Sequence, residues 1–219
     1  MRERLQSELE ATRASFQALL DSLSEGDFHK QSNNPGWTNG EILFHMTLGF
    51  ILIPLLAPLI RFFGRVPDHY SRLFARFLNF GTTLFNWFNA LGARIGGSIY
   101  TRQRIGGEFD RAYSQILRLL DSIGVDEWQL GMYYPTNWDP LFAEYMTLEN
   151  LFHYPTRHFR FHLEQISVRN RSFGEGIIQK NGVRRGCTPP ADTIFLGSYP
   201  LQVGELNGYF CAFRSSYRF

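Results

Sequence analysis

Apolar residues return every three or four positions along four long stretches of this sequence, which is the spacing of one buried helix face. The N-terminal stretch shows the pattern in a stripe made of Leu5, Leu9, Thr12, Phe16, Leu19 and Leu23. The other helices are expected over 38–62, over 100–123, and from residue 140 or 147 to 168. The pattern predicts an all-α fold, a four-helix bundle within residues 1–168, with no strand before residue 169.

The second predicted helix has a clear start and two interruptions. Thr38 is followed three residues later by Glu41, as in a capping box, so the helix is expected to begin there. Pro54 and Pro58 are expected to kink or break it. Residues 46–60 are almost wholly apolar but fewer than the roughly 18–20 that a membrane span needs, which favours a buried bundle helix.

Residues 169–219 differ in composition from the rest of the chain. They hold seven Arg or Lys against three acids, seven Gly and three Pro, and both cysteines, Cys187 and Cys211. We predict a basic, poorly structured C-terminal extension, with short strands near 193–196 and 208–213 or none at all. Two cysteines supply neither a disulfide framework nor a cysteine-based zinc site.

Charge and the N-terminus narrow the class of protein. The formal net charge is only +2 over 219 residues, which argues against a nucleic-acid partner bound through bulk charge. The first residues are charged and helical in period and lack the apolar run of a signal peptide, so a cytoplasmic location is expected.

Phenylalanine is concentrated between residues 62 and 88, where arginines alternate with the rings. This composition is typical of an interfacial helix that makes a peripheral membrane contact. It would equally suit the wall of a large apolar pocket or the face of a homodimer. The sequence leaves these readings open.

Three histidines form a candidate metal site. His158 and His162 are four residues apart and so share one helix face, where both imidazoles can reach one ion. His45 lies in an apolar helix, where an imidazole is costly unless it is bonded or ligated. Three nitrogen ligands leave a coordination position for water or substrate, as in catalytic sites. The alternative is three core histidines without a metal.

The sequence also predicts roles for three polar residues near these histidines. His153 is expected to face away from His158 and His162, and would join them only across a strong kink at Pro155. Gln165 falls on the ligand face and either holds a ligand ring or makes an ordinary packing hydrogen bond. Glu41 is expected to serve the helix cap rather than the His45 ring.

Two motifs resemble those of the DinB-like (DinB/YfiT-like) metalloenzymes. The stretch from Trp37 to His45 is similar to their W-[ST]-x-x-E-x-L-x-H motif, and the stretch from His158 to Ile166 to their H-x-x-x-H-x-x-Q-[IL] motif. The resemblance covers residues 1–168 and implies an up-down-down-up four-helix bundle. It also implies a divalent metal, Zn²⁺ or Ni²⁺, held by His45, His158 and His162.

Several members of that family look like transferases or isomerases that depend on a low-molecular-weight thiol. The resemblance therefore implies a metal-dependent enzyme acting on a small electrophile. Because no cysteine lies in residues 1–168, the thiol would be a co-substrate, with the aromatic middle as the substrate wall. Candidate carboxylate-binding residues are Arg102, Arg104, Arg157 and Arg160, against the alternative of solvated surface charges. There are three competing hypotheses: hydrolysis by the same metal site, a non-catalytic metal-binding or membrane-associated bundle, and a purely structural bundle.

Overall fold

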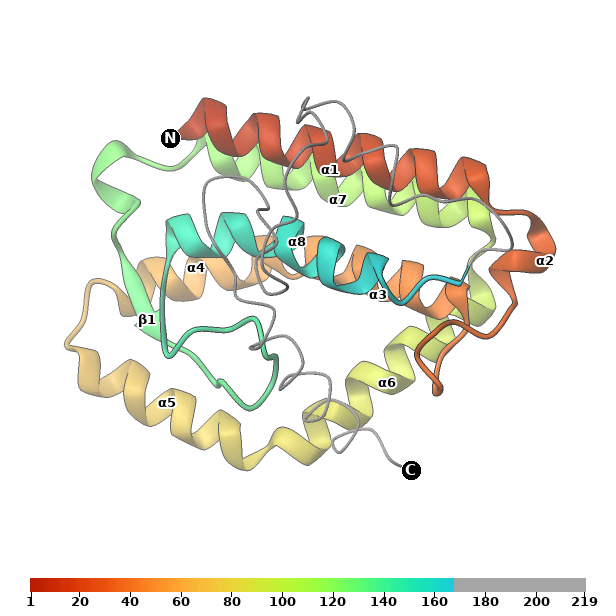
Figure 1. Ribbon diagram of the computed structural model, residues 1–219. Coiled ribbons are helices and arrows are strands. Elements are labelled where there is room, and N and C mark those ends of the chain that lie inside the picture. Colours follow the sequence, from red (N-terminus) through yellow and green to blue (C-terminus); the bar gives the residue numbers. More distant parts are fainter. Residues whose placement is uncertain (168–219) are drawn as a thin grey trace, which may run out of the picture. The chain divides into compact units, whose positions relative to one another are not determined.

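The computed structural model describes residues 1–167 (Figure 1). The predicted C-terminal extension, its strands and both cysteines lie outside the described residues. The helices and strands are α1 (Arg2–Ser22), α2 (Glu25–Phe28), α3 (Asn39–Ile51), α4 (Ile53–Phe63), α5 (Asp68–Phe80), α6 (Thr82–Ile99), α7 (Arg102–Asp121), a 3-10 turn η1 (Val125–Glu127), β1 (Gly131–Tyr133), β2 (Tyr145–Thr147) and α8 (Leu148–Leu163). The prediction of an all-α fold is confirmed.

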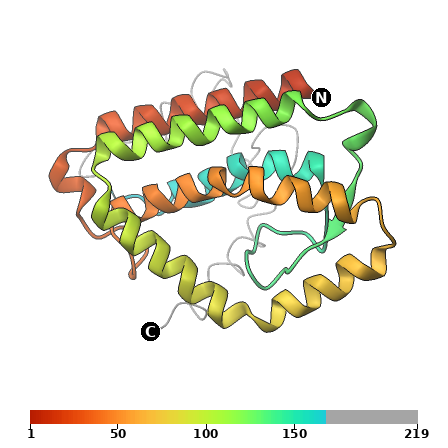
Figure 2. The same ribbon diagram turned by 180° about the vertical axis from the view of Figure 1, so that it is seen from behind.

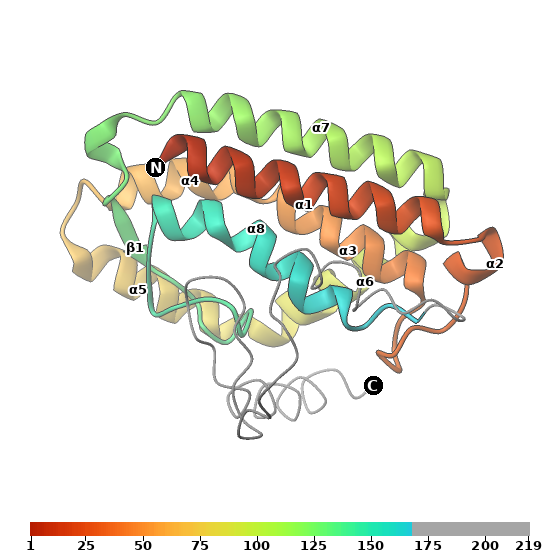
Figure 3. The ribbon, with the colours of Figure 1, turned by 45° about the horizontal axis from the view of Figure 1, so that its top comes forward.

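The bundle consists of α1, the consecutive pair α3–α4, α7 and α8. In Figures 1 and 2, α3–α4 and α7 run in one direction, while α1 and α8 run in the opposite one, which is the up-down-down-up order. Figure 3 shows α1, α7 and α8 lying alongside one another. The Phe-rich stretch forms α5 and α6, and this pair carries the chain back from the end of α4 to the start of α7.

Aromatic stacking joins three of the bundle helices at their centre. Phe16 of α1 stacks on Phe109 of α7 with ring centroids 3.9 Å apart, and Phe109 lies 4.3 Å from the Phe50 ring of α3. All three side chains are fully buried. The predicted stripe of α1 is therefore the face that enters the core, and each of these rings contributes about 2–3 kcal/mol through burial.

The second predicted helix is divided at Leu52. Its start is confirmed, because the Thr38 N–H donates to Glu41 Oε2 at 2.6 Å and the Glu41 N–H to Thr38 Oγ1 at 3.3 Å. Pro54 has no N–H to donate to the carbonyl four residues earlier, and this interrupts the helical hydrogen bonds. As a result, α3 ends at Ile51 and α4 begins at Ile53.

Taken as one segment, Asn39–Phe63 is long and apolar enough to cross a membrane, and half of its most apolar stretch is buried within the fold. A core helix can have the same length and composition. The segment packs against α7 and α8, and its fully buried residues include Ile42, Met46 and Ile60. These contacts agree with the prediction of a buried bundle helix.

An ion-pair cluster fastens the far end of α4. Glu127 receives hydrogen bonds from Arg61 Nε at 2.9 Å and from Arg65 Nη2 at 2.5 Å. The carboxylate also caps the Gly124 N–H at 2.9 Å. The hydrogen bonds from Arg61 are the largest cause that lowers the pKa of Glu127, which falls to about 2.

The prediction of no strand before residue 169 is wrong, since β1 and β2 pair antiparallel with Gly131 opposite Thr147. Each strand has only three residues, too few for a period of two to show in the sequence. Gly131 permits the pairing, because a β-carbon there would lie 2.5 Å from the Tyr145 ring. The last helix begins after Thr147, one of the two predicted starts, but ends at Leu163 rather than near 168.

Candidate metal centre

Hydrogen bonds between distant segments bring the start of α3 beside the end of α8. The Asn39 side chain donates to the Ser167 carbonyl at 2.8 Å and accepts from the Ser167 N–H at 2.9 Å. The Asn33 N–H donates to the Gln165 carbonyl, also at 2.8 Å. The N-terminal half of α3 is thereby fixed against the C-terminal half of α8, and the histidines lie on these halves.

The three predicted histidines come together between the two helices. Nε2 of His45 lies 3.1 Å from Nε2 of His158. One ring nitrogen from each of His45, His158 and His162 falls in a group whose members are all within 4.8 Å of one another. Nitrogens that share one tetrahedral ion at 2.0–2.1 Å are roughly 3.3 Å apart, so the His45–His158 pair already has that spacing.

Burial keeps these imidazoles neutral. His158 and His162 are each 2% exposed and His45 is 7% exposed. Desolvation lowers the pKa of His162 to about 4 and places the pKa values of His45 and His158 well below the ordinary 6.5. At neutral pH all three rings therefore offer a lone pair, which is the form that binds a metal.

Gln165 holds the His162 ring. Its Oε1 lies 3.0 Å from His162 Nδ1, so this nitrogen carries the proton and Nε2 keeps its lone pair. Although α8 ends before Gln165, the residue is buried in the following turn. The reading in which Gln165 orients a ligand ring agrees with this geometry.

Gly49 makes room for the His158 ring. A β-carbon at Gly49 would lie 2.5 Å from His158 Nδ1 and 3.1 Å from Cε1, closer than real side chains approach. Gly49 is one turn after His45 on α3, so the same helix face supplies an imidazole and the gap that receives the second imidazole. Sequence reasoning missed this glycine.

The convergence of one ring nitrogen from each histidine fits a cation. Among the described residues, neither Nδ1 of His45 nor Nδ1 of His158 has a hydrogen-bond partner. Two neutral imidazoles that face each other through Nε2 share a single proton between those atoms. Three converging, uncharged nitrogen donors in a buried site are the donor set of Zn²⁺, Ni²⁺ and related ions. The residues present therefore fit a metal ion.

His153 and Glu41 stand apart from the cluster, as predicted. His153 Nδ1 lies 2.7 Å from Glu8 Oε2 on α1, so the ring is paired on another face of α8. Glu41 is the cap partner of Thr38 and makes no hydrogen bond to the His45 ring.

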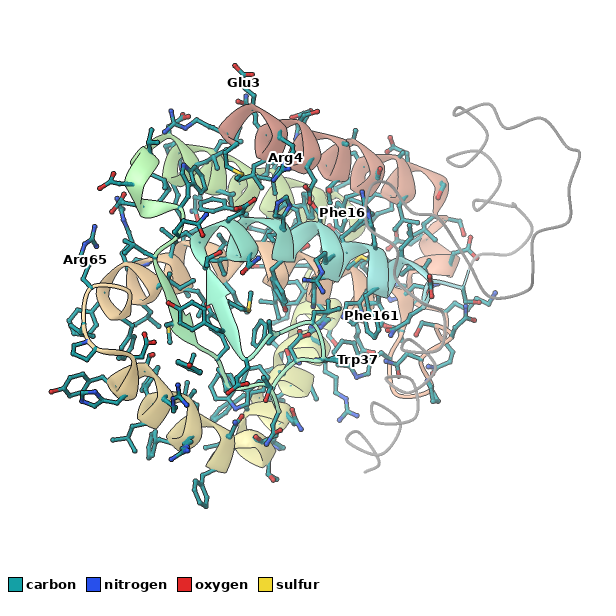
Figure 4. All side chains as sticks on the ribbon, turned by 60° about the vertical axis from the view of Figure 1, so that its left-hand side comes forward. Glu3, Arg4, Phe16, Trp37, Arg65 and Phe161 are labelled. Carbon is teal, nitrogen blue, oxygen red and sulfur yellow. The ribbon has the colours of Figure 1, made fainter. Side chains whose placement is uncertain are left out.

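The rings placed against the cluster are not those the sequence suggested. Trp37 meets the His45 ring edge-on at 4.8 Å, Tyr154 lies 5.3 Å from His158, and Phe161 lies 5.0 Å from His162. Figure 4 labels Trp37 and Phe161 near the C-terminal end of α8. These three rings are close in sequence to the histidines and do not belong to the Phe-rich middle. Tyr154, one turn before His158, follows from helical spacing.

A carboxyl group next to Tyr154 had no sequence signal. The Tyr154 hydroxyl donates to Asp139 Oδ2 at 2.7 Å, and the Leu141 N–H donates to Asp139 Oδ1 at 2.7 Å. Burial raises the pKa of the Asp139 carboxyl above its ordinary value. Asp139 lies in the loop between β1 and β2, so only the folded chain brings it to α8.

The candidate arginines are distributed over several environments. Arg102 donates to the carbonyls of Leu20 and Leu23, which fixes the end of α1. Arg104 is exposed on α7. Arg157 and Arg160 are exposed on α8, where their charges act on Asp139 and Glu8, respectively. Arg157 is therefore the arginine whose charge reaches the carboxyl beside Tyr154.

Comparison with protein families gives one match that covers most of the described chain. Residues 8–166 match the family model described as DinB superfamily. Comparisons with curated proteins and with solved structures gave no match. The matched region includes α3, α8 and all three clustered histidines.

Proposed function

The chain belongs to the DinB superfamily, and we propose that it is a divalent-metal-dependent enzyme that transfers a low-molecular-weight thiol to a small electrophile, or isomerises such a compound. His45, His158 and His162 would be the ligands, and Zn²⁺ or Ni²⁺ the metal. The observation that carries the proposal is the convergence of three buried, neutral imidazoles with one ring nitrogen each within 4.8 Å.

The three imidazole ligands also indicate what kind of molecule would bind at the open position of the metal. Three imidazoles bring no negative charge, so a divalent ion held by them keeps its full charge in a buried site and favours an anion at its remaining position. When bound, such a metal lowers the pKa of water to about 7 and holds a coordinating thiol as thiolate. The bundle contains no cysteine, so the sulfur comes from a separate small molecule.

The residues around the cluster have separate tasks in this proposal. Gln165 keeps the His162 ring in one orientation through its hydrogen bond to Nδ1. Trp37, Tyr154 and Phe161 surround the imidazoles with aromatic surface, which excludes water and provides apolar contact for an organic substrate.

The Tyr154–Asp139 pair supplies polar groups beside His158. The carboxyl accepts the phenol hydrogen bond, and its raised pKa brings it closer to the range in which it exchanges protons. In the transfer, the S–C bond forms as the bond to the leaving group breaks. With an aryl halide, the halide departs with the electron pair and the thiol proton passes to solvent. With an epoxide, the electron pair stays on the ring oxygen, which takes up a proton to become a hydroxyl group.

Metal content is the first test. The full chain, purified without a histidine tag or added metal, is expected to carry about one Zn²⁺ or Ni²⁺ by elemental analysis. H162A should lose the ion. H153A is the matched control on the same helix and should keep it, because His153 pairs with Glu8 instead.

Thiol turnover is the second test. Several small thiols, each offered with an aryl halide or an epoxide, are assayed by loss of free thiol and by product mass. Metal-dependent product formation that H158A abolishes supports the proposal. Bound metal without thiol transfer would instead support a non-catalytic metal-binding module or a hydrolase, and absence of metal would leave three structural histidines.

A further inference from the structure

The helix pair α5–α6 carries a series of exposed apolar side chains. On α5 the series is Tyr70, Leu73, Phe77 and Phe80, and on α6 it is Leu84, Trp87, Phe88, Ile95 and Ile99. Phe77 is 72% exposed and Phe80 is 92% exposed. We call these residues the aromatic face. A patch of this kind marks an interaction site rather than an ordinary protein surface.

Small residues form the opposite sides of both helices, and these sides meet the bundle. Ser71 and Ala75 are the buried residues of α5, which packs against β1 and α4. Gly96 and Gly97 of α6 lie against Phe44 and Glu41 of α3, so closely that a β-carbon would be 2.1 Å and 2.6 Å from these side chains. The aromatic face therefore points away from the bundle. Figure 1 shows α5 and α6 on the side remote from α1 and α7.

Charge on this helix pair is mostly positive. Asp68 is the first residue of α5, and the charged residues that follow it up to residue 100 are Arg72, Arg76 and Arg94, all three of them exposed. Arg72 lies over the Tyr133 ring with its guanidinium carbon 4.1 Å from the centroid. Exposed aromatic and aliphatic side chains flanked mainly by arginine are the chemistry of a helix that lies in an anionic lipid interface.

We propose that the aromatic face of α5–α6 binds the surface of a membrane that contains anionic lipids. A second copy of the chain is a poorer occupant. A symmetric dimer through this face would oppose like patches, and the pair α5–α6 offers only Asp68, at its very start, against the three arginines of the partner. Lipid headgroups supply that missing negative charge. The proposal does not depend on the metal or on the reaction, and it suits a cytoplasmic protein because the cytoplasmic leaflet carries anionic lipids.

Vesicle sedimentation of the full chain tests this contact. The probes are phosphatidylcholine vesicles, alone or with a third of phosphatidylglycerol, at 0.05 M and 0.5 M salt. Binding is expected only to the anionic vesicles and mainly at low salt. R76E should weaken it about thirtyfold, since each unit of charge near the surface is worth about fivefold and reversal changes two.

Matched variants separate the face from the rest of the chain. F77S/F80S should reduce binding at least tenfold, whereas V125S, which changes a 91% exposed apolar residue on η1, should not. R118E on α7 is the charge control for R76E. The proposal fails if the face variants bind like the wild type, which would assign binding to other residues. It also fails if F77S/F80S converts a dimer into a monomer in gel filtration without altering vesicle binding.

Discussion

Gly49→Ala offers a direct test of the metal centre without removing any ligand. The new β-carbon would lie 2.5 Å from His158 Nδ1. Nonbonded atoms of this kind settle at about 3.5 Å, so the ring would have to retreat by about 1 Å. Metal–nitrogen bonds tolerate only about 0.2 Å, and His158 would therefore leave the coordination sphere.

The expected loss is large for binding and small for folding. Removing only a supporting hydrogen bond of a ligand typically costs 10–100-fold in metal affinity, so displacement of a ligand should cost at least about 100-fold, or about 2.7 kcal/mol. Without metal, overpacking of about 1–3 kcal/mol is offset by about 1 kcal/mol of improved helix propensity. The net destabilisation of the metal-free chain should then be at most about 2 kcal/mol.

Competition against a chromophoric zinc chelator measures the affinity, and urea unfolding in EDTA measures the metal-free stability. Gly107→Ala on α7 is the matched control, since nothing lies within 4 Å of its new β-carbon. It should keep wild-type metal affinity and be as stable as the wild type or slightly more so. If G49A folds and binds zinc as tightly as the wild type, His158 is not a ligand in the geometry described.

Three further outcomes follow from named contacts. Gln165→Leu removes the acceptor that orients a ligand ring and should lower zinc affinity 10–100-fold in the chelator assay, while Gln165→Glu should retain most of it. Glu127→Gln should cost about 2 kcal/mol in urea unfolding at pH 7. Because folding lowers the pKa of Glu127 from 4.5 to about 2, its stabilisation is complete above pH 4.5 and is lost as pH falls toward 2. The gap between wild type and variant should narrow over that window, and a gap independent of pH would contradict this assignment. Phe16→Ala should destabilise the chain by about 3–5 kcal/mol, because it leaves a cavity beside Phe109; a loss below 1 kcal/mol would contradict the packing described.

Local signals in the sequence located much of the bundle correctly. The stripe of α1, the cap at Thr38 and the placement of His158 and His162 on one face depend on backbone geometry within a few residues. The strand pair between Gly131 and Thr147 could not be predicted, because it depends on contacts between residues far apart in the sequence. Its three-residue strands are defined by partners 12 to 16 positions away and not by their own periodicity.

The candidate site shows the same division. Helical spacing alone paired His158 with His162. The position of His45 in an apolar helix suggested it as the third member of the group, and the two motifs implied the same set. Gly49 and Asp139 had no comparable signal, because their importance arises from atoms on other elements. The sequence does not distinguish a glycine that faces solvent from one, such as Gly49, where a β-carbon would lie 2.5 Å from an imidazole nitrogen.

Local sequence patterns specify the four bundle helices, the cap at Thr38, the shared face of two imidazoles and the acid-free composition of residues 69–100. The distance of 3.1 Å between Nε2 of His45 and Nε2 of His158, 113 residues later in the chain, and the outward orientation of the aromatic face are properties of the folded chain alone. Helix formation is governed by hydrogen bonds between residues four apart, whereas the approach of α3 to α8 depends on complementary packing between distant segments. Gly49 permits that approach because it has no side chain, and Gly96 does the same for the contact between α6 and α3.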